Sequence, residues 1–339
     1  MRRDRARLLN ARFAALTLLL AAGVALGAEP KDWLDRMNRA LTSRNYIGVF
    51  THNHAGRIET LRIIHRVRGR DVSERLLSLD GPGTEFIREG DELTCYFPDR
   101  RTVLVERRAP DGLLLGALPS LEKSDSMVYE IRGGERERLL GRKTRVIALH
   151  PRDNYRYGYR LWIDEETSMP LKTQLCDSSG AVIEQIVFSA IDLPERIPDS
   201  MFKPSMDAST YRWLRADRRV ATNVAPALWE AMRLPPGFRM ATRSAQAMPG
   251  SSEPVAHLVF TDGIASVSVF VEARKPDLKP EQGPSRVGSS SLFSMVVDGH
   301  QVTAVGEVPP GTVEFIAKEV KAPKAASEAL GLGAAPRRK

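Results

Sequence analysis

The stretch YRYGYRLWIDEETSMPLKTQLCDSSGAVIEQIVF (Tyr155–Phe188) predicts three short β-strands joined by two polar turns. Alternate residues between Tyr157 and Ile163, and again between Val182 and Phe188, share one side of an extended chain, as a period of two requires. Asp164–Thr167 and Asp177–Gly180 have the composition of tight turns. The stretch contains no evident catalytic residue, so it predicts the wall of a sheet.

Working outward from this stretch, the preceding region predicts more strands behind a single amphipathic helix, Trp33–Thr42. The strand-like runs are Tyr46–Thr51, Thr60–Val67, Ser73–Leu79, Glu92–Phe97, Thr102–Glu106, Met127–Arg132 and Lys143–His150. Together they predict an antiparallel meander of about ten strands. One helix covers only part of such a large sheet, so the remaining concave face either closes or stays open as an apolar cavity.

Residues 1–28 have the pattern of a cleaved signal peptide. Arginines precede an apolar run from Phe13 to Leu26, and small residues follow at Gly27 and Ala28. The run is too short to span a bilayer comfortably, and no second one follows. We therefore expect an exported, soluble, periplasmic protein.

The formal charge of +8 comes from the two ends of the chain. The leader holds 5 Arg and one Asp, and Lys318–Lys339 holds 6 Lys or Arg and 2 Glu; removing these from the 50 basic and 42 acidic residues leaves 39 of each. The body is neutral, which argues against nucleic acid as a partner.

Composition divides the chain into five parts: a leader (1–28), a β domain (29–204), a linker (205–222), a smaller α+β domain (223–320) and a disordered basic tail (321–339). In the second domain, Asp262-Gly263 and Asp298-Gly299 predict hairpins. Its strands are predicted at Arg239–Ala241, Val255–Phe260, Ile264–Glu272, Ser291–Val297 and Gln301–Gly306. A closing helix is predicted at Val313–Val320, with Thr312 as its N-cap.

A leucine-rich segment interrupts the strands of the first domain. It is either an apolar flap over the cavity or a short helix that fills the core. On the first interpretation, we expect a lipid cavity lined by Trp33, Met37 and Leu41 together with Leu113, Leu114 and Leu115.

Two pairs of arginines, Arg100-Arg101 and Arg107-Arg108, flank a predicted strand. Paired guanidinium groups bind phosphate, as an anionic lipid headgroup requires, whereas solvated surface arginine is the alternative explanation.

The two cysteines, Cys95 and Cys176, fall in predicted strands. In an oxidising compartment they form either a disulfide, which would add about 4 kcal/mol in the chain-entropy model, or two separate buried thiols.

His52 and His54 would share one strand face, a spacing that can hold Zn²⁺ but that also suits polar histidines on an exposed face. Nucleophile-elbow, metalloprotease and nucleotide-binding fingerprints do not occur in the sequence. We therefore expect no metal, no cofactor and no enzymatic activity.

The whole mature chain resembles the periplasmic sigma-E regulatory protein family, RseB/MucB. The blocks that carry the resemblance are WLDRMNRALTSRNYIGVFTH (33–52), CYFPD (95–99), YGYRLWIDEETSMPLKTQL (157–175), IPDSMFKP (197–204), LPPGF (234–238), DGIASVSVFVE (262–272) and DGHQVTAVGEVPPGTVEFIAKEV (298–320). Met169 departs from the pattern, where a turn glycine is expected.

The resemblance implies a half-open antiparallel β-barrel, similar to lipoprotein carriers, with a helix on its concave face. It also implies binding to the periplasmic domain of a membrane anti-sigma factor, which is thereby shielded from regulatory proteolysis. Release by lipopolysaccharide or lipoprotein acyl chains is implied as well. Such coupling needs an element with two states, and we expect it in the proline-bounded linker at residues 194–222. A periplasmic lipid or lipoprotein carrier is the alternative function, and the sequence leaves open whether the chain forms a homo-oligomer.

Overall fold

The structure, a computed structural model, describes residues 29–107, 114, 127–216, 229–246, 254–274 and 280–322. The leader, Leu113, Leu115, Arg108 and almost all of the basic tail lie outside these residues. Within them, every helix is too short or too polar to cross a bilayer.

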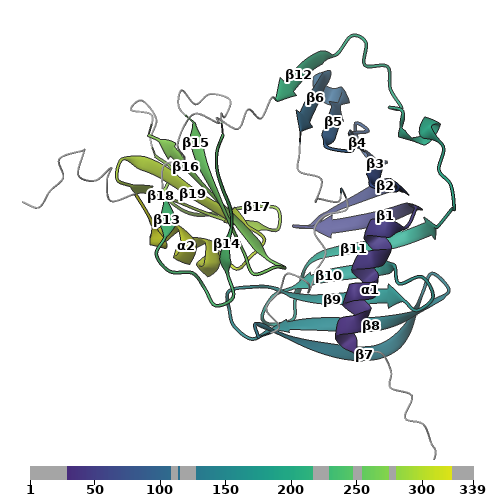
Figure 1. Ribbon diagram of the computed structural model, residues 1–339, viewed down its shortest axis with the longest axis horizontal. Coiled ribbons are helices and arrows are strands. Elements are labelled where there is room, and N and C mark those ends of the chain that lie inside the picture. The colour runs from purple at the N-terminus through teal and green to yellow at the C-terminus, as the bar shows by residue number, and fades with distance from the viewer. Residues whose placement is uncertain are drawn as a thin grey trace, which may run out of the picture.

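Helix α1 (Pro30–Ser43) is the amphipathic helix that the sequence predicts, extended by three residues at its start. Pro30 occupies the first turn, where its missing N–H costs nothing, and Glu29 and Asp32 form a reciprocal capping box. Its apolar side chains, Trp33, Leu34, Met37, Ala40 and Leu41, are all buried. The helix lies across the strands of a large sheet (Figure 1).

The large sheet has twelve strands in the order β12-β6-β5-β4-β3-β2-β1-β11-β10-β9-β8-β7. These strands are β1 (Tyr46–His54), β2 (Arg57–Arg68), β3 (Asp71–Ser78), β4 (Glu85–Glu89), β5 (Glu92–Phe97), β6 (Thr102–Arg107), β7 (Tyr129–Leu139), β8 (Arg142–Pro151), β9 (Gly158–Asp164), β10 (Pro170–Cys176), β11 (Val182–Asp192) and β12 (Arg212–Ala216). Two meanders, β1–β6 and β7–β11, meet where β11 pairs with β1. The three strands predicted from Tyr155–Phe188 are β9, β10 and β11.

The large sheet is open. Among the described strands, β12 pairs only with β6 and β7 only with β8, so no pairing joins the two ends. The expected barrel is therefore not confirmed, although α1 does cover one face of the sheet (Figure 1). A core of buried side chains lies between the helix and this face, and Phe50, Leu161, Ile163 and Phe188 contribute to it from the strands.

Part of the region predicted as a linker (205–222) pairs with the large sheet. β12 lies within it and runs parallel to β6, with Trp213 opposite Val103. Ahead of it, Ile197 and Phe202 are buried against Ile64, and Arg75 donates to the carbonyl of Met201. The expected switching element is thus attached to the sheet over much of its length.

The second domain has its own sheet, in the order β14-β15-β16-β19-β18-β17. Its strands are β14 (Arg239–Gln246), β15 (Val255–Thr261), β16 (Ser266–Ala273), β17 (Gly283–Val287), β18 (Ser290–Val297) and β19 (His300–Gly306), and β13 (Glu230–Ala231) and β20 (Val320–Lys321) form a separate pair. Asp298 and Gly299 both have positive φ, 46° and 77°, in the predicted β18–β19 hairpin.

Helix α2 (Pro310–Glu319) packs on this second sheet, with Val313, Ile316 and Ala317 fully buried. The predicted N-cap was wrong, because the helix begins at Pro310 and its N-cap is Pro309. Thr312 lies inside the first turn, where its hydroxyl donates to the backbone oxygen of Tyr155 at 2.8 Å. That side chain therefore joins the two domains and does not cap the helix.

Candidate functional site at the domain junction

Arg156 is the centre of the contact between the two domains. Its side chain is fully buried, on the loop that leads from β8 to β9. In its own domain, Nε and Nη2 each lie 3.0 Å from a carboxylate oxygen of Asp153. Across the junction, Nη1 donates to Asp262 and Nη2 to the carbonyl of Pro236, both at 2.5 Å.

Asp262 is held as firmly as its partner. It is fully buried in the turn between β15 and β16, and its second oxygen accepts the N–H groups of Ile264 and Ala265 at 2.8 and 2.7 Å. A buried charge is costly unless it is paired and hydrogen-bonded, and both conditions hold here. We call Arg156, Asp153, Asp262 and Pro236 the Arg156 junction.

The same loop makes further contacts with the second domain. The ring of Tyr155 meets Phe315 edge-on at 5.7 Å, and the hydroxyl of Tyr157 accepts a hydrogen bond from Arg286 at 3.2 Å. Gly237 is needed in this contact, since its φ is +77° and a Cβ there would lie 2.8 Å from Val128. The loop is therefore clamped from several elements of the second domain.

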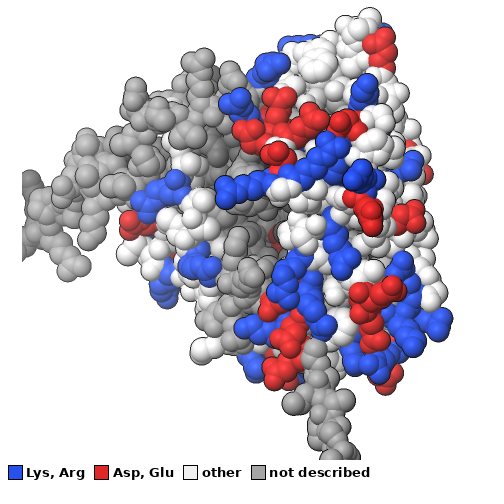
Figure 2. Space-filling model, turned by 45° about the vertical axis from the view of Figure 1, so that its right-hand side comes forward, with Lys and Arg blue, Asp and Glu red and all other residues white. Residues whose placement is uncertain are grey.

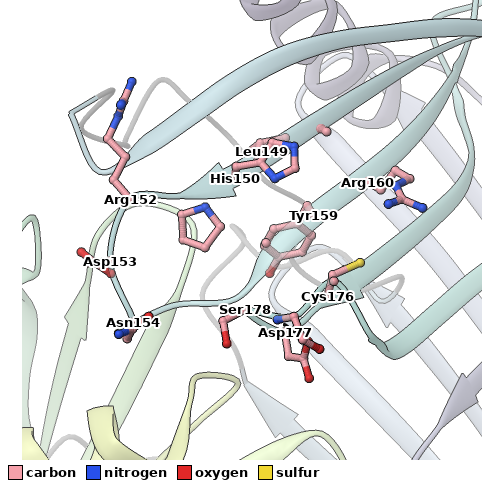
Figure 3. A pocket seen from close by; sticks show the side chains of 15 residues that line it. Leu149, His150, Arg152, Asp153, Asn154, Tyr159, Arg160, Cys176, Asp177 and Ser178 are labelled. Atoms are coloured by element: carbon pink, nitrogen blue, oxygen red, sulfur yellow. Dashed lines mark hydrogen bonds between the residues drawn. The ribbon is translucent and has the colours of Figure 1, made fainter.

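A pocket of about 410 Å³ adjoins this loop. It lies between the loop carrying Arg152, Asp153 and Asn154 and the turn carrying Asp177 and Ser178 (Figure 3). Hydrogen bonds from Ser179 and Ala181 lower the pKa of Asp177, so this turn carries negative charge. The pocket is thus lined by charged side chains of both signs, directly beside the junction.

The residues expected to line a lipid cavity are packed instead. Trp33, Met37 and Leu41 have exposed fractions of 8%, 0% and 1%, within the core under α1. Leu114 packs against this core, and its N–H donates to the buried carboxylate of Glu74 at 3.2 Å. The structure thus brings these four residues together in one hydrophobic core, and none of them lines the pocket beside the junction.

The predicted headgroup arginines do not converge. Arg100 and Arg101 lie at the turn before β6, whereas Arg107 is at the far end of this six-residue strand, roughly 20 Å from Arg101 at about 3.4 Å per residue. Arg101 also donates to the hydroxyl of Thr210 at 2.8 Å. Acidic and basic side chains alternate over the face that Figure 2 shows, in keeping with the neutral body of the chain.

Cys95 and Cys176 are both buried, and no disulfide joins them. Cys95 is on β5 and Cys176 on β10, with five strands of the sheet between them. At about 4.8 Å per strand this separation far exceeds the reach of a disulfide. Of the two alternatives, the structure therefore has the separate buried thiols.

His52 and His54 do share one face, and their rings stack at 4.6 Å. This face is partly buried, which corrects the expectation of an exposed one. Nε2 of His52 lies 2.9 Å from Oε1 of Glu184, so this ring nitrogen already has a partner within the protein. The described residues contain no group of three or more His, Cys, Asp or Glu side chains arranged to hold a metal ion.

Sequence reasoning missed the Arg156 junction although both of its charged ends lie in segments that it quoted. Arg156 stands within an aromatic run, and its parity matches that of Arg160, so it resembles the solvent side of a strand. Asp262 resembles an ordinary Asp-Gly turn. An arginine between two tyrosines in an otherwise apolar wall was the available signal, but its partner, 106 residues away, was not visible.

Both domains match families of known proteins. The family model of the MucB/RseB N-terminal domain matches residues 29–206, and that of the MucB/RseB C-terminal domain matches residues 223–321. The sigma factor AlgU regulatory protein MucB of Pseudomonas aeruginosa is 32% identical over 331 residues, which cover 94% of this chain and 99% of MucB. The sigma-E factor regulatory protein RseB of Escherichia coli K12 is 27% identical, covering 90% of this chain and 94% of RseB.

Solved structures agree with the sequence matches. A crystal structure of MucB in complex with MucA(peri) has a TM-score of 0.67 and 28% identity to this protein, covering 87% of this chain and 99% of that one. A crystal structure of MucB alone has a TM-score of 0.62 and 27% identity, covering 88% and 99%. The chain therefore belongs to the MucB/RseB family.

Proposed function

We propose that this protein is a periplasmic negative regulator of the envelope-stress sigma-E response, which binds the periplasmic part of a membrane anti-sigma factor. The observation that carries the proposal is the full-length similarity to MucB, including the structure described as MucB in complex with MucA(peri). The similarity includes the second domain, which a simple lipid carrier does not need. Export follows from the signal-peptide pattern of residues 1–28.

The domain junction is the best-supported place for the anti-sigma segment. A peptide there would contact both domains at once, and it would find the pocket beside Asp153 already formed. A segment held in that way is withdrawn from a protease, because a protease needs an extended and accessible substrate. Bound in this way, the regulator shields the anti-sigma factor from the first cut.

Release by lipid is part of this proposal, with the apolar core under α1 as the place where an acyl chain would bind. Trp33, Met37 and Leu41 are buried in this core and Leu114 packs against it, so an acyl chain from lipopolysaccharide or a lipoprotein would enter by displacing Leu114 or by shifting the helix. Burial of acyl chain contributes roughly 0.8 kcal/mol per CH₂. A few methylenes therefore supply enough differential binding to change the affinity for the anti-sigma segment by orders of magnitude.

Isothermal titration calorimetry tests the proposal directly. The mature chain from Glu29 onward is titrated with a synthetic periplasmic segment of the anti-sigma factor encoded in the same genome, and then again after saturation with lipopolysaccharide. We expect micromolar or tighter binding that lipopolysaccharide weakens at least tenfold. A scrambled peptide of the same composition is the control, and equal heats from both peptides would refute the proposal.

A further inference from the structure

A second pocket, of about 570 Å³, lies in the first domain and shares no lining residue with the pocket beside the Arg156 junction. Three short segments line it: Asn45, between α1 and β1, residues 66–68 at the end of β2, and residues 195–198. The last segment belongs to the connection from β11 to β12, which runs along one side of the large sheet (Figure 1). We call this site the arginine pocket.

Positive charge is concentrated at the arginine pocket. Its lining contains three arginines, Arg66, Arg68 and Arg196, and one acidic residue, Glu195. With the residue on either side of each segment included, positions 44–46, 65–69 and 194–199 hold four arginines and two acidic residues. The body of the chain as a whole is balanced, so this surplus of positive charge is local. A concave site with such a surplus attracts anions.

Arg66 is the fixed part of the pocket. Its side chain is only 8% exposed. Nη1 donates to the carbonyl oxygen of Ile197 at 3.1 Å and Nη2 to the hydroxyl of Ser73 at 3.2 Å. The guanidinium group lies over the ring of Phe202, 4.3 Å from its centroid. Because these contacts already hold the group in place, it loses little conformational entropy when it binds a ligand.

Asp199 shows that these arginines can hold an anion together. Its Oδ1 accepts a hydrogen bond from Nη1 of Arg66 at 2.6 Å and another from Nη1 of Arg68 at 3.0 Å. The hydrogen bond from Arg66 and the charge of Arg68 lower the pKa of Asp199 below its ordinary 3.8. The side chain of Asp199 is 74% exposed and that of Arg68 57%, so a ligand in solution can reach the same two guanidinium groups.

Arg196 adds a third guanidinium group. It is exposed, and within the described residues it forms no ion pair, although Glu195 is its neighbour in the chain. Asn45 positions the segment that carries it, since its Nδ2 donates to the backbone oxygen of Glu195 at 2.8 Å and its Oδ1 accepts the N–H of Val67 at 2.9 Å. Arg196 is therefore placed at the pocket and is available to a ligand.

We propose that the arginine pocket binds a phosphate group, which Arg66, Arg68 and Arg196 hold through its oxygens. Guanidinium groups bind phosphate through paired N–H donors, and phosphate offers more acceptor oxygens than the one carboxylate of Asp199. The pocket is larger than a phosphate ion and within the range of sites for small molecules. Its ligand is therefore a phosphorylated organic molecule of about the size of a sugar phosphate.

Two sources provide such a ligand: a soluble sugar phosphate and the phosphorylated headgroup of a lipid. With the second source the inference deepens the proposed function, because the pocket then adds a headgroup site to release by lipid, and in that respect alone it rests on the proposed function. Arg100, Arg101 and Arg107, which the sequence suggested for a headgroup, do not converge. The three arginines of this pocket do.

A ligand in the pocket acts on the connection to β12. This connection is held by the contacts of Asp199 with Arg66 and Arg68, by the ring of Phe202 under Arg66, and by Arg75, which donates to the carbonyl oxygen of Met201 at 2.9 Å. A phosphate that takes the two arginines from Asp199 removes one of these contacts. The pocket thus lies against the segment that the sequence suggested as the switching element.

Isothermal titration calorimetry of the mature chain from Glu29 onward tests phosphate binding without any anti-sigma peptide. The titrants are glucosamine 1-phosphate and glucosamine, which differ only in the phosphate group. We expect saturable binding of one glucosamine 1-phosphate per chain and no measurable binding of glucosamine.

Arg196→Ala is the decisive variant, because Arg196 has no ion-pair partner in the described part of the chain whose loss would disturb the fold. We expect its affinity for glucosamine 1-phosphate to fall at least tenfold. Arg57→Ala is the matched control, since Arg57 is an exposed arginine at the opposite end of the same strand, β2. It should bind as the unmodified protein does, and both variants should melt at the same temperature.

A second arm distinguishes the two sources. Intact lipopolysaccharide and lipopolysaccharide treated with a phosphatase are compared for release of the anti-sigma peptide. If the ligand is a lipid headgroup, phosphatase treatment and Arg196→Ala each raise the concentration for half release at least fivefold, and the two together raise it no further. If the ligand is a soluble sugar phosphate, neither changes release, while Arg196→Ala still loses glucosamine 1-phosphate.

Either of two results overturns the phosphate site: glucosamine 1-phosphate that binds no better than glucosamine, or equal affinities for it in Arg196→Ala and Arg57→Ala. Failure of intact lipopolysaccharide to release the peptide from the unmodified protein counts instead against the proposed regulation. The two titrations therefore fail separately.

Discussion

Arg156 and Asp262, 106 residues apart in the chain, form an ion pair in which neither side chain is exposed to solvent. The pair joins a loop of the twelve-stranded sheet to a turn of the six-stranded sheet. Because both charges have left water, each depends on the other and on the hydrogen bonds around it. These two side chains therefore fix one contact between the domains, and removing either of them should destabilise the protein.

Replacing Arg156 by methionine should lower the free energy of unfolding by about 3–5 kcal/mol, since it leaves Asp262 charged, buried and without its partner. Urea denaturation of the mature chain measures this loss. Arg136→Met is the control, because Arg136 pairs with Glu165 at the surface and should cost about 1 kcal/mol or less. Adding Asp262→Asn to Arg156→Met should restore part of the lost free energy of unfolding. A double variant whose loss equals the sum of the losses of the two single variants would contradict the pairing.

Leu114→Asp should weaken the response to lipid while leaving the anti-sigma segment bound. The new carboxylate would enter the apolar core under α1 close to Glu74, where an acyl chain would otherwise lie. We expect the concentration of lipopolysaccharide that releases half of the anti-sigma peptide to rise at least tenfold, as measured by fluorescence anisotropy. Leu79→Asp, at a position 48% exposed, is the control, and an equal shift in both variants would remove Leu114 from the lipid path.

Cys95 and Cys176 should react slowly in the folded protein. Burial raises the pKa of the Cys176 thiol above its ordinary 9.0, and the thiolate is the reactive form. Ellman's reagent should therefore detect two thiols per chain after denaturation but a small fraction of that number within minutes in the native state at pH 8. An Ile58→Cys variant gives the fast reference, and detection of no thiols after denaturation would mean that the two are bonded.

Gly306→Ala should destabilise the second domain, whereas Gly311→Ala should not. A Cβ on Gly306 would lie 2.5 Å from the backbone oxygen of Ser266 on the paired strand, so the strands must separate. We expect a loss of about 1–3 kcal/mol, the usual cost of overpacking. Gly311, in the first turn of α2, has nothing within 4 Å of that position. Thermal unfolding compares the two, and equal melting temperatures would contradict the close approach.

Local patterns predicted much of the fold. The alternation from Tyr155 to Phe188 gave three strands, the apolar face from Trp33 to Leu41 gave a buried helix, and Asp298-Gly299 gave a hairpin with the positive φ values that such turns need. Each of these features depends on neighbours in the chain. Period, capping and turn chemistry are local properties, and a single sequence displays them directly.

The features that the sequence did not reveal depend on distant partners. β12 is stabilised by pairing with β6, more than a hundred residues earlier, so its own five residues look like a linker. Thr312 looks like an N-cap because its true acceptor, the carbonyl of Tyr155, is far away in sequence. The packed state of Trp33, Met37 and Leu41 is likewise set by the curvature of a whole sheet, which no short window contains.

The pairing of β1 with β11 bears on how the chain is made. Ile47 on β1 lies opposite Asp192 on β11. Strand β1 therefore has only β2 as a neighbour until roughly 145 further residues have been synthesised. Until then β1 is an edge strand whose outer N–H and C=O groups have no hydrogen-bond partner in the sheet. Such an edge favours aggregation, and the long-range pairing makes formation of the sheet slow. We therefore expect nascent chains that end before residue 182 to need a chaperone, and those that extend past residue 192 to mature without one.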